Sequence, residues 1–140
     1  MLPTETHTLL EQAGFAVPTG VRLEVGSRKA RFLGRVISMF DAPPVAFVLG
    51  STIYVPNAES YRRLSRETRA ALLAHECEHV HQWRRLGMAG FIAHYLREYF
   101  RVRRHGIATH DPVRGIDLER EAIAVEQRVW AALQERRRVV

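Results

Sequence analysis

The sequence contains a single cysteine and no long apolar run. Because Cys77 has no second cysteine to pair with, the 140-residue chain forms no internal disulfide. No stretch of about 18 apolar residues is present, so we expect no membrane span. The N-terminal residues include Glu5 and Glu11 and lack the apolar core of a signal peptide. These absences predict a cytoplasmic protein in which Cys77 is a buried structural thiol.

The basic residues are almost all arginine. Lys29 is the one lysine among 21 basic residues, and the net charge is +6. Arg97, Arg101 and Arg104 are spaced to share one helical face, which we expect to be solvated. No nucleic-acid-binding motif accompanies this charge, so we do not expect a nucleic-acid partner. With 46% hydrophobic residues, the chain is suited to one globular domain, residues 1–140.

Apolar periodicity and turn residues predict strands in the first half of the chain and helices in the second. Gly50 opens a two-residue hairpin turn, and Gly87 ends a helix. Phe91, Tyr95 and Tyr99 recur at four-residue spacing, which is typical of a core-facing stripe. The predicted class is α+β, with a small, twisted, mainly antiparallel sheet. We expect helices at residues 5–13, 65–86, 89–104 and 117–137, and strands at residues 21–25, 31–38, 45–49 and 52–55.

The most informative pattern is an H-E-x-x-H motif formed by His75, Glu76 and His79. On a helix each residue advances by about 100°, so the two histidines lie one turn apart on the same face. At that spacing two imidazoles can bind one Zn²⁺ ion, and the intervening glutamate can activate a water molecule bound to the zinc. The motif therefore predicts a zinc site with Glu76 as its catalytic base.

A catalytic zinc site usually has three protein ligands, so a third must come from elsewhere in the chain. The extended motif that supplies a third histidine nearby is absent, because Gln82 and Arg85 occupy the required glycine and histidine positions. The best source is the predicted helix at 117–137, whose first turns are rich in glutamate. A rival source is His105, followed by Gly106 in the sequence.

An H-E-x-x-H motif followed by a helix opening with E-x-E-A resembles the gluzincin class of zincin metallopeptidases. Residues 45–83 also resemble a bacterial putative-metallopeptidase family of poorly known function. The resemblance implies a minimal zincin fold, in which the glutamate helix lies beneath the metal. It also implies that Glu119 is the third ligand, with Glu121 second and Glu126 a distant third. The chain departs from many gluzincins at Ile123, where the pattern has aspartate.

This resemblance implies a zinc-dependent metallo-endopeptidase acting on a peptide or protein substrate. In zincins the substrate adds as a strand to a sheet edge above the metal, and residues 45–49 are the candidate edge. Two alternatives remain open. The chain is either a non-catalytic zincin-fold module that binds a metal or a partner, or a regulatory, DNA-associated protease of the SprT-like kind. The pair His105-Gly106 resembles the His-Gly of that last group and motivates it.

Overall fold

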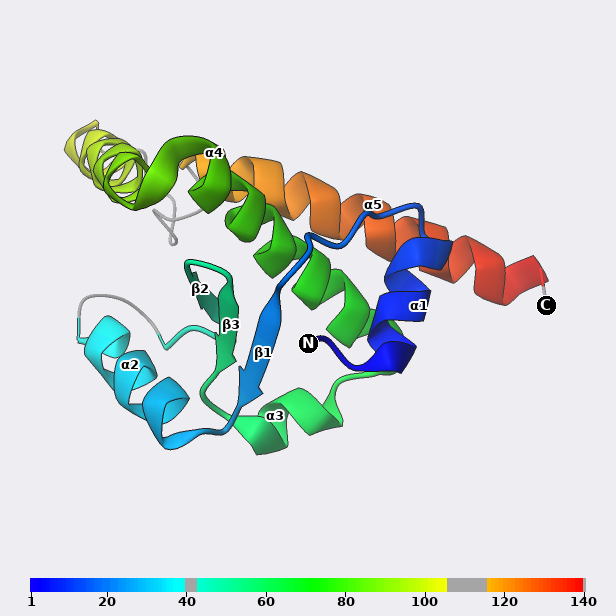
Figure 1. Ribbon diagram of the computed structural model, residues 1–140. Coiled ribbons are helices and arrows are strands. Elements are labelled where there is room, and N and C mark those ends of the chain that lie inside the picture. The colour runs from blue at the N-terminus through cyan, green and yellow to red at the C-terminus, as the bar shows by residue number, and fades with distance from the viewer. Residues whose placement is uncertain (40–42, 106–115, 140) are drawn as a thin grey trace.

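The computed structural model describes residues 1–39, 43–105 and 116–139, which contain five helices and three strands (Figure 1). The mixture of helices with one small sheet confirms the α+β class. In chain order the elements are α1 (Thr4–Gln12), β1 (Arg22–Val25), α2 (Arg28–Ser38), β2 (Phe47–Leu49), β3 (Thr52–Val55), α3 (Ala58–Arg63), α4 (Arg66–Arg104) and α5 (Asp117–Val139).

The sheet has the strand order β1-β3-β2, so that β3 lies in the centre. β1 pairs with β3 in parallel, from Arg22 opposite Thr52 to Val25 opposite Val55. β2 pairs with β3 in antiparallel fashion across the turn at Gly50, whose φ is 63°. The expectation of a mainly antiparallel sheet is therefore wrong, because the parallel pairing is the longer of the two. The expected edge position is confirmed for β2.

The strand expected at residues 31–38 is also wrong, because these residues belong to helix α2. The hydroxyl oxygen of Ser27 accepts a hydrogen bond from the backbone N–H of Ala30 at 3.0 Å and caps the helix. Ala30 and Gly34 are buried one turn apart. A Cβ added at Gly34 would lie 2.6 Å from Cγ of Pro56, so the proline ring packs directly on the glycine. Paired apolar residues in this segment fit either periodicity, and the cap decides in favour of the helix.

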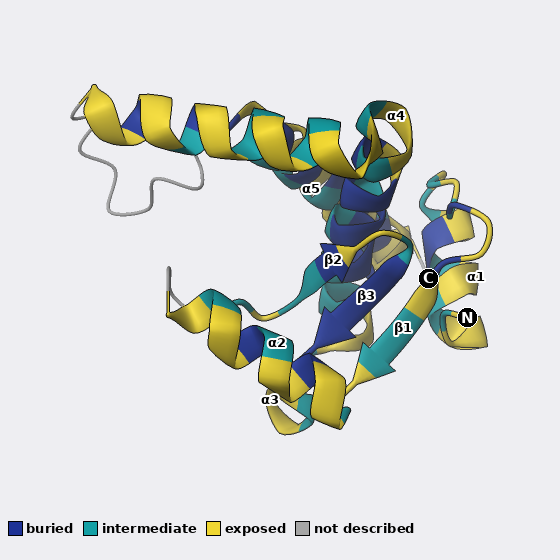
Figure 2. Ribbon diagram, turned by 60° about the vertical axis from the view of Figure 1, so that its left-hand side comes forward, coloured by how far each residue is buried: buried dark blue, intermediate teal, exposed yellow. Residues whose placement is uncertain are grey.

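Helix α4 consists of two helical segments joined at a kink, as the sequence predicts. Gly87 has φ 71° and ψ 168°, a conformation that favours glycine and breaks the helical path. Residues 66–86 carry the H-E-x-x-H motif and pack against the sheet. Residues 88–104, here called the α4 arm, project away from the rest of the molecule (Figure 2).

The core lies on both sides of the first segment of α4. On one side Leu73, Cys77 and Val80 pack against Ile53 and Val55 of β3. The burial predicted for the Cys77 thiol is confirmed, because this residue is 0% exposed. On the other side α1 and α5 cover the helix (Figure 1). In the described segments no helix is long and apolar enough to cross a membrane.

Candidate metal centre

The candidate site lies where α5 packs along α4. The contact uses small residues on α4, among them Ala70 and Ala74, facing a buried stripe on α5 that includes Val125 and Val129. Small side chains let the two helix backbones approach closely. Glu119 lies in the first turn of α5, next to this stripe, and its side chain therefore reaches the α4 face that carries His75.

Donor atoms of three residues, His75, His79 and Glu119, converge on one point. Nε2 of His75 lies 3.2 Å from Nε2 of His79 and 3.3 Å from Oε2 of Glu119. Nε2 of His79 lies 3.4 Å from Oε1 of Glu119. Donor atoms bound tetrahedrally at about 2.1 Å from one zinc ion lie about 3.4 Å apart. The donor types and their spacing therefore fit a zinc ion.

The second nitrogen of each histidine is held by a neighbouring side chain. Nδ1 of His75 lies 3.1 Å from Oε2 of Glu126, and Nδ1 of His79 lies 2.8 Å from Oε1 of Gln82. The orientation of the Gln82 amide is fixed, because its Nε2 donates to the carbonyl of Leu118 at 2.9 Å. Both partners are acceptors, so each ring donates from Nδ1 and directs Nε2 at the cluster, where a metal ion that displaces a proton can bind it.

The electrostatics of the cluster favour a cation at its centre. Burial alone would lower the pKa of His75, but hydrogen bonds to Glu119 and Glu126 outweigh it and raise the pKa to about 10. Burial opposes the charge on Glu119 too, yet the two histidines hold the pKa of its carboxyl at about 2. His75 thus keeps its extra proton, and its positive charge, well above neutral pH. A divalent metal ion that displaces this proton supplies positive charge to the carboxylates in its place.

Glu76 differs from the other carboxylates of the site because its oxygen Oε2 has no partner among the described residues. Only 4% of the residue is exposed. Burial raises the pKa of its carboxyl, while the positive charge of His79 and His75 opposes the shift. A buried carboxylate without a hydrogen-bond partner is costly and makes a strong base. Glu76 is therefore suited to accept a proton from a molecule in the adjoining cavity.

That cavity has a volume of about 720 Å³ and opens above the cluster. His75, Glu76, His79 and Glu119 contribute to its floor. One wall is the edge strand β2 with the residues before it, from Pro43 onward. The opposite wall belongs to α4 and its arm. That wall includes Trp83, Phe91, Ile92, Tyr95 and Leu96.

Phe91 and Tyr95 of the aromatic stripe line this cavity, so the expectation that these two residues are core is wrong. Phe91 stacks on Trp83 with ring centroids 4.8 Å apart, and Tyr95 stacks on Phe91 at 6.1 Å. Ile92 and Leu96 next to the stripe are 44% and 47% exposed. Helical periodicity indicated an apolar face correctly, but it cannot distinguish a face in the core from one that lines an open cleft.

The structure brings together the residues that the motif and the resemblance single out. His75, His79 and Glu119 form one group whose possible ligand atoms all lie within 4.8 Å of one another, and within residues 1–39, 43–105 and 116–139 no other such group occurs. Glu121 lies outside it, because its carboxylate accepts from Gln82 at 3.0 Å and pairs with Arg85 at 3.3 Å.

The rival ligand His105 is not part of the group either. It follows the last residue of α4, and its Nδ1 lies 2.9 Å from the carbonyl oxygen of Arg101. The residue after it, Gly106, lies outside the described residues. The structure therefore gives no support to His105 as the third ligand.

Two residues of the site have roles that the sequence did not reveal. Gln82 was noted only for breaking an extended motif, and Glu126 was ranked as a distant alternative ligand. Gln82 follows His79 by three residues, and Glu126 follows Glu119 by seven, so each shares a helical face with a ligand. That spacing was the available signal, but it does not specify which ring nitrogen a side chain reaches.

No family model, no curated protein and no solved structure matches this chain. The function must therefore be argued from the site itself.

Proposed function

We propose that this protein is a zinc-dependent endopeptidase of the gluzincin type, with His75, His79 and Glu119 as zinc ligands. The observation that carries the proposal is the convergence of these three donors at tetrahedral spacing below an open cavity. A cluster that served only to link α4 to α5 would not need a cavity above it. The motif, and the position of its helix between a small sheet and α5, support the same proposal.

Zinc held there would act as a Lewis acid that polarises a substrate carbonyl and makes a water molecule more acidic. The carboxylate of Glu76 would accept the proton of the attacking water and return it to the nitrogen of the departing amine. Its burial supports this role, because the raised pKa makes its carboxylate more basic than one in water. Glu126 and Gln82 would keep the two imidazoles in the orientation and tautomer that bind a metal.

The substrate class follows from the walls of the cavity. Among the residues that the structure describes, β2 pairs only with β3, and its residues line the cavity. An extended peptide can add to such an edge through backbone hydrogen bonds, which recognise any sequence. We therefore infer a peptide or an unfolded protein segment as the substrate.

The test is hydrolysis of an unstructured protein by the purified full chain, followed over time on a gel. We expect cleavage that stops when a chelator removes the metal and returns when zinc is added. A chain that binds zinc stoichiometrically by elemental analysis but cleaves nothing would instead be the non-catalytic metal-binding module. A chain that binds no zinc would refute the metal site as well.

A further inference from the structure

Exposed apolar side chains gather on α2 and on the α4 arm. Seven of the thirteen large hydrophobic residues that are exposed in the described chain lie on these two elements or directly after α2. Phe32 on α2 is 65% exposed, and Phe100 on the arm is 57% exposed. The remaining five are Val36, Met39, Met88, Ile92 and Leu96.

These side chains form an exposed stripe on each helix, and Ile92 and Leu96 of the arm also line the cavity. On α2, Phe32 and Val36 lie one turn apart, while the opposite side of the helix packs through Gly34 against Pro56. On the arm, Met88, Ile92, Leu96 and Phe100 recur every four residues and are all exposed. A helix that packs only against the body of the protein needs one apolar face, so these stripes indicate a further contact.

The same two elements carry the positive charge of the molecule. α2 has four basic residues and no acidic one, and the α4 arm has four arginines and one glutamate. The two segments together have a net charge of +7, whereas the whole chain has +6, so that all other residues sum to −1. The single acidic residue, Glu98, is paired with Arg101 at 2.6 Å. The charge is therefore concentrated where the apolar side chains are exposed.

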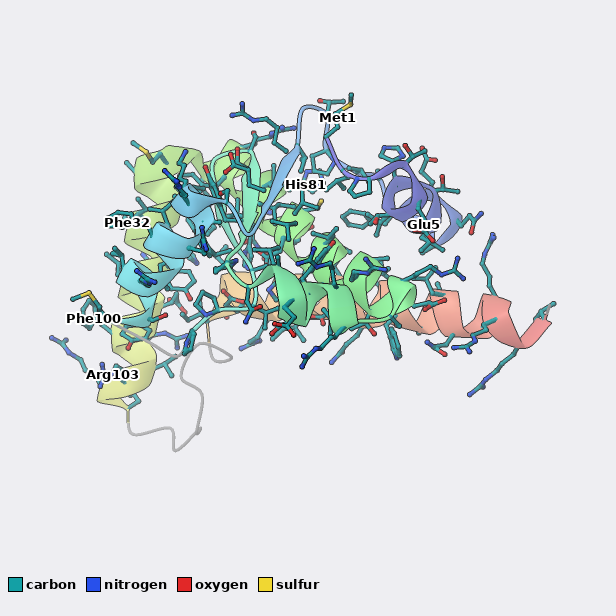
Figure 3. The ribbon with its side chains drawn as sticks, turned by 90° about the horizontal axis from the view of Figure 1, so that it is seen from below. Met1, Glu5, Phe32, His81, Phe100 and Arg103 are labelled. Atoms are coloured by element: carbon teal, nitrogen blue, oxygen red, sulfur yellow. The ribbon has the colours of Figure 1, made fainter. Side chains whose placement is uncertain are left out.

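Both elements contribute to the lining of the candidate active-site cavity, through Ile37 of α2 and Leu96 of the arm. Figure 2 shows α2 and the arm extending in the same direction, with mostly exposed surfaces. In Figure 3, Phe32 and Phe100 both lie at the end of the molecule away from Met1 and Glu5. We call the exposed residues of α2, Met39 and the α4 arm the cleft-mouth surface.

We propose that the cleft-mouth surface docks onto an anionic phospholipid bilayer. Phenylalanine, methionine and leucine side chains insert at the boundary between headgroups and acyl chains, while arginine guanidinium groups pair with lipid phosphates. Charge complementarity favours this partner, because a surface of net charge +7 is attracted to an anionic leaflet. The chain would lie on the membrane with the mouth of its cavity at the headgroups.

A nucleic acid could pair with the arginines and stack on Phe32 and Phe100, but it would leave the aliphatic side chains of Met88, Ile92 and Leu96 without a partner. A protein partner or a second copy of the chain would cover the apolar stripes, but an interface core is normally depleted of charge. The interleaving of arginine and large apolar residues is typical of helices that lie in a membrane interface. The bilayer is therefore the partner that accounts for both sets of residues.

The test is flotation of the purified full chain with phosphatidylcholine vesicles that contain either no anionic lipid or about one-third phosphatidylserine. We expect binding to the anionic vesicles, little binding to the neutral ones, and a decline as salt is added. The variant Phe32→Ser/Phe100→Ser should reduce the bound fraction about tenfold, because its two largest insertion points are lost. Both residues are largely exposed, so the fold should be unchanged by circular dichroism.

Three further variants keep the proposal falsifiable. Arg28→Gln/Arg31→Gln removes charge from exposed positions of α2 and should weaken binding in the same way. Trp130→Ser, an exposed apolar residue on α5, should bind like the unchanged chain. Replacing the arginines at 136–138 with glutamine should also leave binding intact.

Failure to bind anionic vesicles would overturn the proposal, as would full binding by Phe32→Ser/Phe100→Ser. Loss of binding in the 136–138 variant alone would assign the affinity to the basic C-terminal end. A dimer in solution that dissociates on Phe32→Ser/Phe100→Ser would assign the surface to a second copy instead. None of these outcomes depends on whether the protein cleaves peptides.

Discussion

Oε2 of Glu126 lies 3.1 Å from Nδ1 of His75, while Glu119 faces Nε2 of the same ring at 3.3 Å. The two glutamates are seven residues apart on α5, which is two helical turns, so one helix places a carboxylate at each nitrogen of the imidazole. Glu126 thereby fixes the nitrogen that carries the proton and leaves the other as the metal-facing donor. Ile123, which stands where the gluzincin pattern has aspartate, is not needed for this contact.

The first prediction concerns this orienting contact. Glu126→Ala should weaken zinc binding about ten- to a hundredfold, because the ring loses the acceptor that fixes its tautomer and orientation. Glu126→Gln, which keeps an acceptor oxygen but no charge, should lose less. Competition with a fluorescent zinc chelator measures both. Glu135→Ala, an exposed glutamate on the same helix, is the matched control. Equal zinc affinity in all three variants would show that Glu126 has no part in the site.

The second prediction separates the ligand from its neighbour on α5. Glu119→Ala should lose most of its zinc on purification, because two histidines alone do not hold a catalytic zinc ion. Glu121→Ala should keep about one zinc per chain, since that carboxylate accepts from Gln82 and Arg85 outside the donor group. Elemental analysis of the variants purified side by side measures the difference. The reverse result would make Glu121 the third ligand.

The third prediction concerns the base. Glu76→Gln should retain zinc and lower peptide hydrolysis about a hundred- to ten-thousandfold, because the amide cannot accept the proton of the attacking water. The free energy of unfolding should be unchanged or higher, since the substitution removes a buried carboxylate whose Oε2 lacks a partner. Glu78→Gln, two residues along the same helix, should behave as the unchanged protein. A fully active Glu76→Gln variant would remove this residue from the mechanism.

Much of this site could be predicted from the sequence because helical spacing is a local property. The residues His75, Glu76 and His79 are fixed relative to each other by one turn of α4. The position of Glu119 next to the histidines depends on the packing of two helices that are far apart in the sequence. From the sequence, only the resemblance favoured Glu119 over Glu121. The structure supports that choice by geometry.

The misjudged parts of the fold depend on tertiary context. Residues 31–38 have paired apolar residues that suit a strand or a helix, and the Ser27 cap and the Gly34–Pro56 contact favour the helix. The parallel pairing of β1 with β3 arises because α2 and β2 lie between them in the chain, which no local pattern records. The apolar stripe containing Phe91 has the periodicity of a core helix, yet it lines a cavity.

The fourth prediction is a pH dependence that zinc reverses. The pKa of His75 in the folded, metal-free protein is about 10, above the ordinary 6.5. The stability it contributes is complete below about pH 6.5 and is lost as the pH rises toward 10. The pKa of Glu119 is about 2, below the ordinary 4.5, so its contribution is lost only when the pH falls below about 4.5. The metal-free protein should therefore melt at a lower temperature at pH 9 than at pH 6.

The stabilisation by zinc should increase with pH, because protons compete less with zinc for the histidine nitrogens as the pH rises. The increase in melting temperature on adding zinc should thus be larger at pH 9 than at pH 6, as measured by calorimetry with chelated and zinc-loaded protein. In Glu119→Ala, both the pH dependence of the metal-free melting temperature and the increase on adding zinc should be smaller. This comparison separates the contribution of the cluster from the titration of the remaining groups. A metal-free protein that is equally stable at both pH values would show that His75 and Glu119 do not form the charged pair on which the proposed zinc site depends.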